Sequence, residues 1–301
     1  MNRFNMTLAG VLASLFLAVA ASANTTVFDQ GFETDTDGIN PYPGPVARVA
    51  SGGGSLGVAS ADGGYHAEVT LGSSYGDGFY TWNGGASSFW PGYVKQSIKV
   101  YIDPAAGQVN DGWWWDAGLS NENGNWVAGG GFGVRKTAAG TWSMGAEDVY
   151  GGFHYVGHTR WNHDNTTALE ISTAGWYTLA TEWVNSATLP DLIDQVNTVR
   201  DASGSLLWID TVAGCLTQLS GNPSGAGLRS AGGMSYSWLG SQASKDDSGY
   251  DPDYDDNPLY APTNTMTTLA FDDVHAEIIP EPATMALLGA GGLVLIRRRR
   301  A

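Results

Sequence analysis

The chain has 301 residues, among them 42 glycines, 12 tryptophans and one cysteine, a composition that disfavours long helices and excludes an intrachain disulfide or a zinc–cysteine cluster. Acidic residues outnumber basic ones by 30 to 14, for a formal net charge of −16. Such a surface repels phosphate backbones and argues against nucleic acid as a partner. Five basic residues, Arg3 and Arg297 to Arg300, lie near the two ends. The rest of the chain therefore carries nine basic and 30 acidic residues, a net charge of −21.

Residues 1–23 have the pattern of a secretory signal peptide with an N-terminal signal helix. Arg3 supplies a basic amino end, and an uncharged apolar run covers residues 8–21. Ala21 and Ala23 stand at the small-residue positions that signal peptidase reads, which predicts cleavage after Ala23. The alternative is a membrane anchor that stays attached, but the run is short for a span.

Residues 24–279 have the pattern of one all-β domain, an antiparallel β-sandwich. Long helical periodicity is absent, whereas apolar and polar residues alternate in short segments between glycine-rich turns. A turn signal, Asp201 to Gly204, separates two of these segments. Residues 189–199, the one candidate helix, are taken as a strand or short turn. The predicted strands cover residues 93–103, 175–183, 196–200, 206–209 and 268–278.

Three consecutive tryptophans, Trp113 to Trp115, precede an Asn-Gly pair at residues 123–124 that predicts a hairpin tip. The predicted cross-strand pairs are Trp113 with Val134, Trp114 with Gly133, Trp115 with Phe132, and Asp116 with Gly131. Glycines beside an indole leave its ring uncovered, so Trp114, with Asp116 next to it on that face, is predicted to bind a glycan. The alternative is that all three tryptophans pack inside the sandwich.

The acidic segment at residues 246–257 holds six carboxylates in twelve positions. Asp251, Asp253 and Asp255 alternate along it and are candidate calcium ligands, because calcium takes six to eight oxygen ligands. The spacing is not that of a helix–loop–helix calcium site. The alternative is a solvated loop held open by self-repulsion.

Catalytic motifs lack the structural context that they need. The Gly-x-Ser-x-Gly pattern at residues 53–57 has no evident strand before it or helix after it, so a turn is expected there. His154, His158 and His163 lack the spacing of a helical zinc pair. We therefore predict no catalytic residue and a non-enzymatic protein, the alternative being a polysaccharide-degrading hydrolase or lyase with an unrecognised site.

The C-terminal tail, residues 280–301, has three parts. Pro280, Glu281 and Pro282 come first, a short apolar helix is predicted over residues 283–296, and Arg297, Arg298, Arg299 and Arg300 follow. The helix is shorter than the roughly 20 residues of a comfortable membrane span, and the arginines favour the cytoplasmic side. This tail resembles the PEP-CTERM sorting signal of Gram-negative bacteria. The resemblance implies cleavage by an exosortase-type membrane protease, whereas the alternative is an ordinary tail anchor.

The middle of the chain resembles the concanavalin A-like jelly-roll domains of secreted bacterial proteins. The pieces that carry the resemblance are residues 27–33, 175–178, 201–204 and 269–274. It implies that the first and last strands pair and that the domain binds glycans. It also suggests a structural calcium ion where the strands meet, held by Glu33 with Asp272 or Asp273.

Together these features predict a protein that is transiently anchored in the inner membrane and then reaches the cell surface or extracellular matrix of a Gram-negative bacterium. Signal peptidase and an exosortase-type protease are the expected partners, and extracellular polysaccharide is a further candidate. The β-sandwich is expected to bind glycan or to serve as a matrix component, and a calcium-dependent adhesion module is an alternative.

Overall fold

A computed structural model describes residues 25–42, 45–71, 78–83, 93–109, 111–120, 126–150, 168–188, 192–217, 234–241 and 268–278. Every regular element within these ranges is a β-strand, and every strand pairing is antiparallel. The all-β antiparallel prediction is therefore confirmed for this part of the chain. The predicted signal helix and C-terminal helix lie outside the described residues. Within the described ranges, no helix is long and apolar enough to cross a bilayer.

The larger sheet has eight strands in the order β13-β12-β11-β6-β15-β4-β3, with β1 paired to β15. Its strands are β1 (Thr25–Gln30), β3 (Val46–Ala50), β4 (Tyr65–Thr70), β6 (Tyr93–Ile102), β11 (Gly175–Asn185), β12 (Leu192–Asp201), β13 (Leu206–Thr217) and β15 (Thr268–Ile278). The first and last strands pair, as the jelly-roll resemblance implied.

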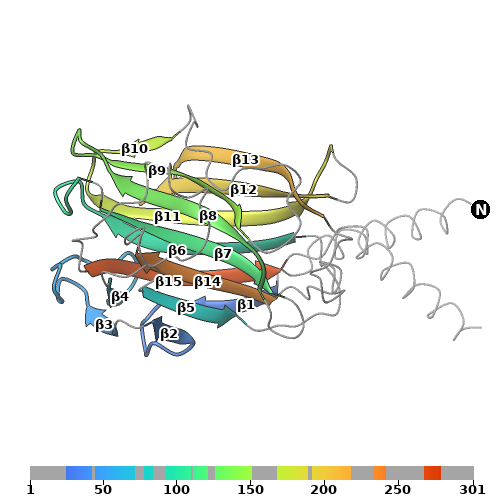
Figure 1. Ribbon diagram of the computed structural model, residues 1–301. Helices are drawn as coiled ribbons and strands as arrows, with labels where there is room; N and C mark the ends of the chain where they lie inside the picture. Colours follow the sequence, from blue (N-terminus) through green and yellow to red (C-terminus); the bar gives the residue numbers. More distant parts are fainter. Residues whose placement is uncertain are drawn as a thin grey trace, which may run out of the picture.

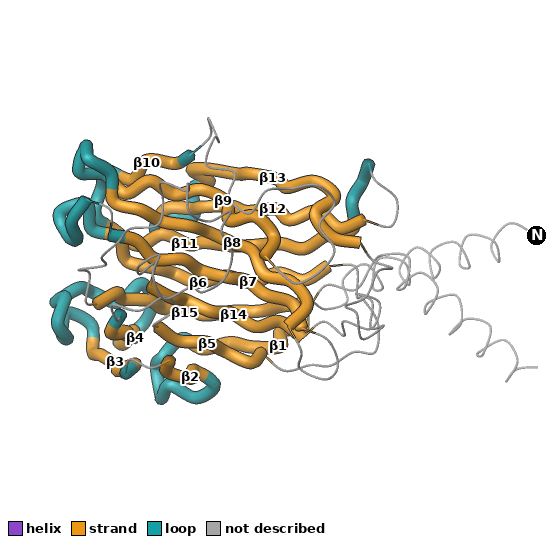
Figure 2. Tube along the Cα trace, viewed as in Figure 1, coloured by secondary structure: helices purple, strands orange, loops and turns teal. Residues whose placement is uncertain are grey.

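The smaller sheet has seven strands in the order β10-β9-β8-β7-β14-β5-β2. Its strands are β2 (Ile39–Tyr42), β5 (Gly78–Asn83), β7 (Gly112–Ser120), β8 (Trp126–Lys136), β9 (Trp142–Tyr150), β10 (Leu169–Ile171) and β14 (Met234–Ser241). Figure 1 shows the two sheets as stacked layers, and Figure 2 shows several of the connecting loops gathered at one end of the stack.

The alternating sequence pattern explains why these segments form strands that bury one face. Along β6, every second residue from Val94 to Ile102 is buried, and the residues between them are half-buried. The segment at residues 192–201 is a strand, as expected, and the chain reverses at Gly204, which takes a positive φ of 83°. The turn amide of Gly204 donates a hydrogen bond to the Asp201 carbonyl at 2.9 Å. Sequence alternation thus correctly located most of the larger sheet.

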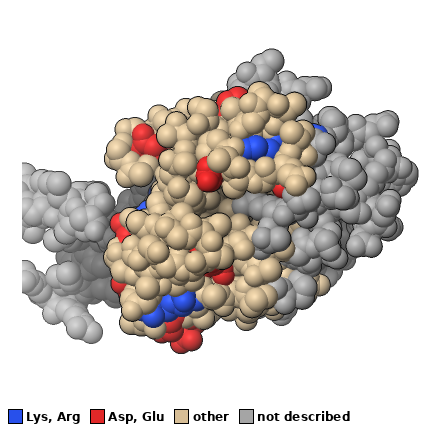
Figure 3. Space-filling view, turned by 90° about the vertical axis from the view of Figure 1, so that its left-hand side faces the viewer, with Lys and Arg blue, Asp and Glu red and all other residues tan. Residues whose placement is uncertain are grey.

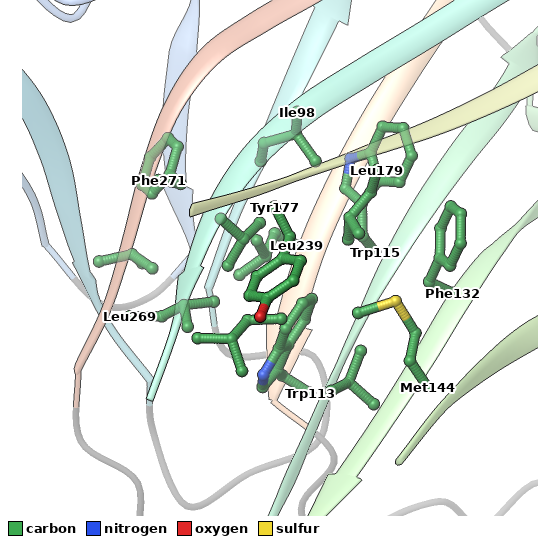
Figure 4. Close-up of a cluster of buried hydrophobic side chains, with 14 of the residues drawn as sticks. Ile98, Trp113, Trp115, Phe132, Met144, Tyr177, Leu179, Leu239, Leu269 and Phe271 are labelled. Carbon is green, nitrogen blue, oxygen red and sulfur yellow. The ribbon is translucent and has the colours of Figure 1, made fainter. Parts of the chain in front are cut away.

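The core lies between the two sheets and is rich in aromatic side chains (Figure 4). Trp113 and Trp115 of β7 are fully buried in it, and the Trp115 indole stacks on Phe132 with ring centroids 6.0 Å apart. On the larger sheet, Leu179 and Phe271 face the same core. Burial of such large apolar side chains is the main force that holds the two layers together.

Hydrogen bonds across the core fix the backbone of β7. Gln96 Nε2 donates to the Gly118 carbonyl at 2.8 Å, and the Trp183 indole N–H donates to the Ala117 carbonyl at 3.0 Å. Both donors come from the larger sheet and are fully buried. Buried hydrogen bonds of this kind specify position because leaving either group unpaired is costly. Strand β7 is therefore held in place beneath the outer face of the smaller sheet.

Candidate ligand-binding face

The hairpin register predicted around the three tryptophans is confirmed. Strands β7 and β8 pair Trp113 with Val134, Trp114 with Gly133, Trp115 with Phe132 and Asp116 with Gly131. A one-residue shift occurs nearer the turn, between Leu119 and Ser120, and the predicted Asn-Gly tip lies outside the described residues. Trp113 and Trp115 consequently face the core, whereas Trp114 and Asp116 lie on the outer face of the smaller sheet.

The prediction that the Trp114 ring is uncovered is wrong, because this residue is only 4% exposed. The prediction considered the glycines of β8 on one side of β7. On its other side β7 pairs with β14, where Trp238 stands opposite Asp116. The Trp238 ring lies against Trp114 with centroids 5.4 Å apart and planes tilted by 57°. Trp114 is thus part of a larger group of rings and is no isolated platform.

Four rings form an aromatic cluster on this outer face: Trp114, Trp238, Tyr80 and Tyr42. They come from the consecutive strands β7, β14, β5 and β2. Trp238 lies 6.3 Å from Tyr80 and 5.5 Å from Tyr42, and the two tyrosines are 6.3 Å apart, all between ring centroids. Tyr42 is 50% exposed, and Tyr80 and Trp238 are half-buried. The accessible aromatic surface is therefore on β2, β5 and β14.

Glycines occupy the row of the sheet that runs through Trp114. In one direction, Trp114 faces Gly240, which faces Gly78, which faces Tyr42. In the other direction, Trp114 faces Gly133, which faces Gly145, and a side chain added at Gly145 would enter open space. Because these glycines carry no side chains, the rings of the neighbouring row can lean across the sheet, and the glycines themselves are buried.

Asp116 is placed on the predicted face but is 5% exposed. Its Oδ1 accepts a hydrogen bond from the Gly130 amide at 2.7 Å. Gly130 lies where the pairing of β8 with β9 shifts register, between Gly129 and Gly131. Asp116 therefore holds the irregular backbone of β8 beside the aromatic cluster, a positioning role that the sequence pattern did not reveal.

Sequence reasoning missed Tyr42, Tyr80 and Trp238. A signal for one of them exists, since residues 235–238 alternate serine with an aromatic residue, the period-2 pattern of a strand with one aromatic face. The pairing of this segment with β7 spans more than 100 residues of sequence, and no local pattern reports such a partner. The aromatic cluster therefore becomes visible only in the folded chain.

The outer face of the larger sheet carries a different structure, a strap formed by residues 51–64 between β3 and β4. The Trp176 indole N–H of β11 donates to the Ala59 carbonyl at 2.7 Å, and Lys99 of β6 forms an ion pair with Asp62. The Asp62 amide donates to Asp272 Oδ2 of β15 at 3.3 Å. The strap is thus attached to three strands besides β4, which follows it directly.

Glu68 of β4 anchors the strap from below. Its carboxylate accepts hydrogen bonds from the Ser55 amide at 2.9 Å, the Ser55 hydroxyl at 2.7 Å and the Leu56 amide at 3.1 Å. Burial raises the pKa of Glu68, but these hydrogen bonds outweigh it and leave the pKa below its usual value. Residues 53–57 accordingly form turns, with a positive φ at Gly54 and Gly57. Ser55 is a structural donor in this arrangement.

His66 lies beside Glu68 and is fully buried. Its Nδ1 is 3.1 Å from the Ser60 hydroxyl, and its Nε2 is 3.9 Å from Glu68 Oε1. Burial lowers the pKa of His66 despite the nearby carboxylate, so the imidazole stays neutral at pH 7. The Ser60–His66 contact therefore fastens the strap to β4, at an imidazole that has no solvent access.

The three acids suggested for calcium at the meeting of the chain ends all lie near the strap but have separate partners. Glu33 accepts hydrogen bonds from the Gly64 amide at 2.9 Å and the Tyr65 amide at 3.1 Å. Asp272 is fully buried and accepts from the Asp62 and Asp273 amides, while Asp273 pairs with Lys99 at 2.9 Å. Across the described residues, no three His, Cys, Asp or Glu side chains form a group that could hold a metal ion.

Other predicted sites lie outside the described residues. They are the calcium candidates Asp251, Asp253 and Asp255, the cleavage residues Ala21 and Ala23, the histidines His154, His158 and His163, and the sorting residues Pro280, Glu281, Pro282, Arg297, Arg298, Arg299 and Arg300.

A small crevice of about 110 Å³ is lined by the strap, by the segment after β6 and by the ends of β6, β7, β9 and β15. The buried Trp113 and Trp142 line it together with Leu56 of the strap, which is 39% exposed, and Ala106. At the end of the molecule that faces the viewer in Figure 3, the charged side chains form separate patches on a mainly uncharged surface. The crevice includes no member of the aromatic cluster, so the two are separate features.

Residues 279–300 match the PEP-CTERM protein-sorting motif. The chain carries a PEP-CTERM sorting motif. The match covers the proline, apolar and arginine parts of the tail, so the resemblance stated from the sequence is confirmed. PEP-CTERM sorting implies an exported protein. The match does not reach the two sheets, and a comparison with curated proteins finds no relative.

Several solved structures share low similarity with the chain. An alginate lyase from Aplysia kurodai has a TM-score of 0.46 at 10% identity, covering 85% of this chain and 100% of that one. Alginate lyase Aly36B with bound alginate trisaccharide has a TM-score of 0.42 at 11% identity, with coverage of 71% and 82%. A xylan-binding domain of Xyn10C from Paenibacillus barcinonensis has a TM-score of 0.37 at 9% identity, with coverage of 87% and 99%. At these scores the similarities assign neither a site nor an activity.

Proposed function

We propose that this chain is an exported, non-catalytic glycan-binding protein that is sorted to the cell surface or extracellular matrix. In this proposal a signal peptide is removed after Ala23, and residues 24–279 form a concanavalin A-like jelly roll. The helix at residues 283–296 anchors the precursor in the inner membrane of a Gram-negative bacterium until an exosortase-type protease processes the tail. The sorting motif supports the route, and the aromatic cluster supports the binding activity.

The observation that carries the binding proposal is the aromatic cluster on the outer face of the smaller sheet. Tyr42, Tyr80 and Trp238 expose ring surface on neighbouring strands and are backed by the buried Trp114. Aromatic faces are suited to sugar rings, because both surfaces are flat and partly apolar.

The ionisable groups near the cluster favour binding over hydrolysis. Strands β2, β5, β7 and β14 contain one carboxylate, Asp116, and no histidine, lysine or arginine. Glycoside hydrolysis usually needs two carboxylates that flank the scissile bond. Asp116 already accepts a hydrogen bond from the β8 backbone. We therefore propose a binding role for this face and no reaction at it.

The test is retention of the exported domain on an array of soluble polysaccharides. Replacing Trp238 by alanine (Trp238→Ala) removes the ring that contacts the other three, and we expect a loss in affinity of at least about tenfold, the effect of a central aromatic contact. Tyr80→Ala should weaken retention as well. The matched control is Tyr101→Ala, because Tyr101 is half-buried on the outer face of the larger sheet and also contacts one tryptophan, Trp176.

Thermal unfolding of each variant shows whether the sandwich is intact. Selective loss of retention in folded Trp238→Ala and Tyr80→Ala supports the proposal. Unchanged retention in both variants, or failure of the native domain to bind any polysaccharide, overturns it.

The sorting route is tested by replacing the four arginines at 297–300 with serine, with a four-lysine variant as the control. Because basic residues resist translocation, the lysine variant should be processed normally and the serine variant should be misrouted or stay uncleaved. Fractionation and immunoblotting of the precursor and processed forms measure this. Normal processing of the serine variant would refute the route.

A further inference from the structure

We infer that the aromatic cluster takes a single chain of a neutral polysaccharide, in preference to a polyanionic glycan or a crystalline polysaccharide surface. This inference rests on the proposed function and specifies its ligand. It follows from two properties of the described face, the distribution of charge around the rings and the angles between them.

Cationic side chains are absent from the four strands that carry the rings. Together β2, β5, β7 and β14 have 27 residues, of which only Asp116 is charged. Uronate and sulfate groups are bound mainly by arginine and lysine, which supply charge-assisted hydrogen bonds. A polyanion at these four strands would meet accessible aromatic rings and no cationic partner, because Asp116, their one charged residue, is buried.

The nearest described cation on this face is Arg135 of β8, which stands opposite Gly112 and Ser143. Two strands, β7 and β14, separate β8 from Tyr80 on β5. Burial lowers the pKa of Arg135, so its charge is partly desolvated. The rest of the chain adds a net charge of −21 once the terminal basic residues are excluded, which repels polyanions at long range. Both the local and the overall charge therefore favour an uncharged ligand.

The rings are tilted too steeply against one another to form a flat binding surface. Trp238 is tilted by 57° from Trp114, by 57° from Tyr80 and by 83° from Tyr42. A crystalline polysaccharide surface is flat and needs coplanar rings, whereas a single chain can turn from one ring to the next. The cluster crosses four consecutive strands, so such a chain would run across the strands, beside the row that holds Gly240 and Gly78.

The experiment compares ligands that differ in charge or in packing. Affinity electrophoresis measures the binding of the native domain, Trp238→Ala and Tyr101→Ala to soluble mixed-linkage glucan, xylan and galactomannan, and to alginate and polygalacturonate. Microcrystalline cellulose is tested by sedimentation. Each measurement is made at about 0.05 and 0.5 M salt, which spans weak to strong screening.

We expect at least one neutral soluble polysaccharide to be retained independently of salt and to lose at least about tenfold in affinity in Trp238→Ala. Polyuronates and cellulose should not be retained. A converse variant is Asn40→Lys, which adds a cation opposite Tyr80 and should create salt-sensitive polyuronate binding.

The outcomes separate the inference from the proposed function. Polyuronate or cellulose retention that disappears in Trp238→Ala would leave the proposed function standing and overturn the inference. If Trp238→Ala retains each bound glycan as well as the native domain does, both the inference and the proposed function are overturned. Retention of neutral soluble chains alone, sensitive to Trp238→Ala and insensitive to Tyr101→Ala, supports both.

Discussion

The two outer faces of the sandwich are built from the same alternating strand pattern but present opposite chemistry. On the smaller sheet, the aromatic cluster spans four strands that contain one charged residue. On the larger sheet, Lys95 lies 4.0 Å from Glu182 and 3.7 Å from Glu277. These three side chains form a charged row, and in the next row His275 lies 3.3 Å from Asp29.

The larger sheet is also partly covered by its own chain. The strap crosses it and is held by Glu68, Lys99 and Trp176. Polar groups of the strap and of the larger sheet therefore bind one another, whereas the smaller sheet presents ring surface that a ligand can contact. Burial alone therefore does not show which of the two outer faces binds a ligand, because both contain buried polar and aromatic side chains. Among the described residues, the smaller sheet is distinguished by accessible rings on four strands whose one charged residue, Asp116, is buried.

The largest effect that separates the two faces should come from Glu68→Ala. The substitution leaves two backbone amides and one hydroxyl of the strap without their acceptor, and hydrogen bonds to a charged group are worth about 1.5–3 kcal/mol each. Because these losses overlap, we expect the free energy of unfolding to fall by about 3 kcal/mol. Urea denaturation at pH 7 measures it, and polysaccharide retention should be unchanged while the domain is folded.

Glu182→Ala is the matched control, because Glu182 is a more exposed glutamate of the same sheet. The pKa of Glu68 is depressed in the folded state, so its contribution is present above the ordinary value of 4.5 and is lost as the pH falls through the folded pKa. The difference between native and Glu68→Ala should therefore shrink in acid. Equal stability of the two variants at pH 7 would show that Glu68 does not anchor the strap.

Local pairing could be predicted from the sequence, and long-range pairing could not. Counting back from the Asn-Gly pair correctly placed Trp115 opposite Phe132, although the pairing shifts by one residue nearer the turn. The same reasoning failed for the exposure of Trp114, because Trp238 arrives from a strand more than 100 residues away in the sequence. A pattern in one segment reports which face is apolar but not which strand will lie beside it.

The acids show the same limit. The predicted pairing of the first and last strands makes Glu33 and Asp272 candidates for one site, and those strands do pair. Their partners come from the strap, whose path follows from backbone turns and hydrogen bonds that no residue pattern displays. Charge and residue type identified these acids as notable, but only the fold shows which groups they bind.

A smaller, pH-dependent effect is expected from Asp272→Asn. Burial raises the pKa of Asp272 from 3.8 to about 6, although amides of Asp62 and Asp273 and the charge of Lys99 oppose the shift. The folded state therefore binds the proton more tightly than the unfolded state, and the contribution of Asp272 to stability falls as the pH rises through about 6.

Asparagine does not titrate, so the variant should gain stability relative to the native chain by about 1–2 kcal/mol between pH 5 and pH 8. Thermal and urea unfolding in EDTA measure the difference without a contribution from bound calcium. Asp201→Asn is the control, since Asp201 is at the exposed β12–β13 turn and its pKa is lowered by hydrogen bonds from Ser203 and Ser205. If the difference in the free energy of unfolding between the native chain and Asp272→Asn does not change with pH, the raised pKa of a buried Asp272 is contradicted.

The smallest effect should come from Lys95→Met on the charged row. The Lys95 side chain is one-third exposed, and ion pairs at such positions typically contribute about 0–1 kcal/mol because water and salt screen them. We expect a loss of less than about 1 kcal/mol in the free energy of unfolding, larger at low salt because Glu182 and Glu277 then repel each other without the intervening ammonium. Polysaccharide retention should be unaffected. A change in retention would place part of the ligand site on the larger sheet and remove the distinction between the two faces.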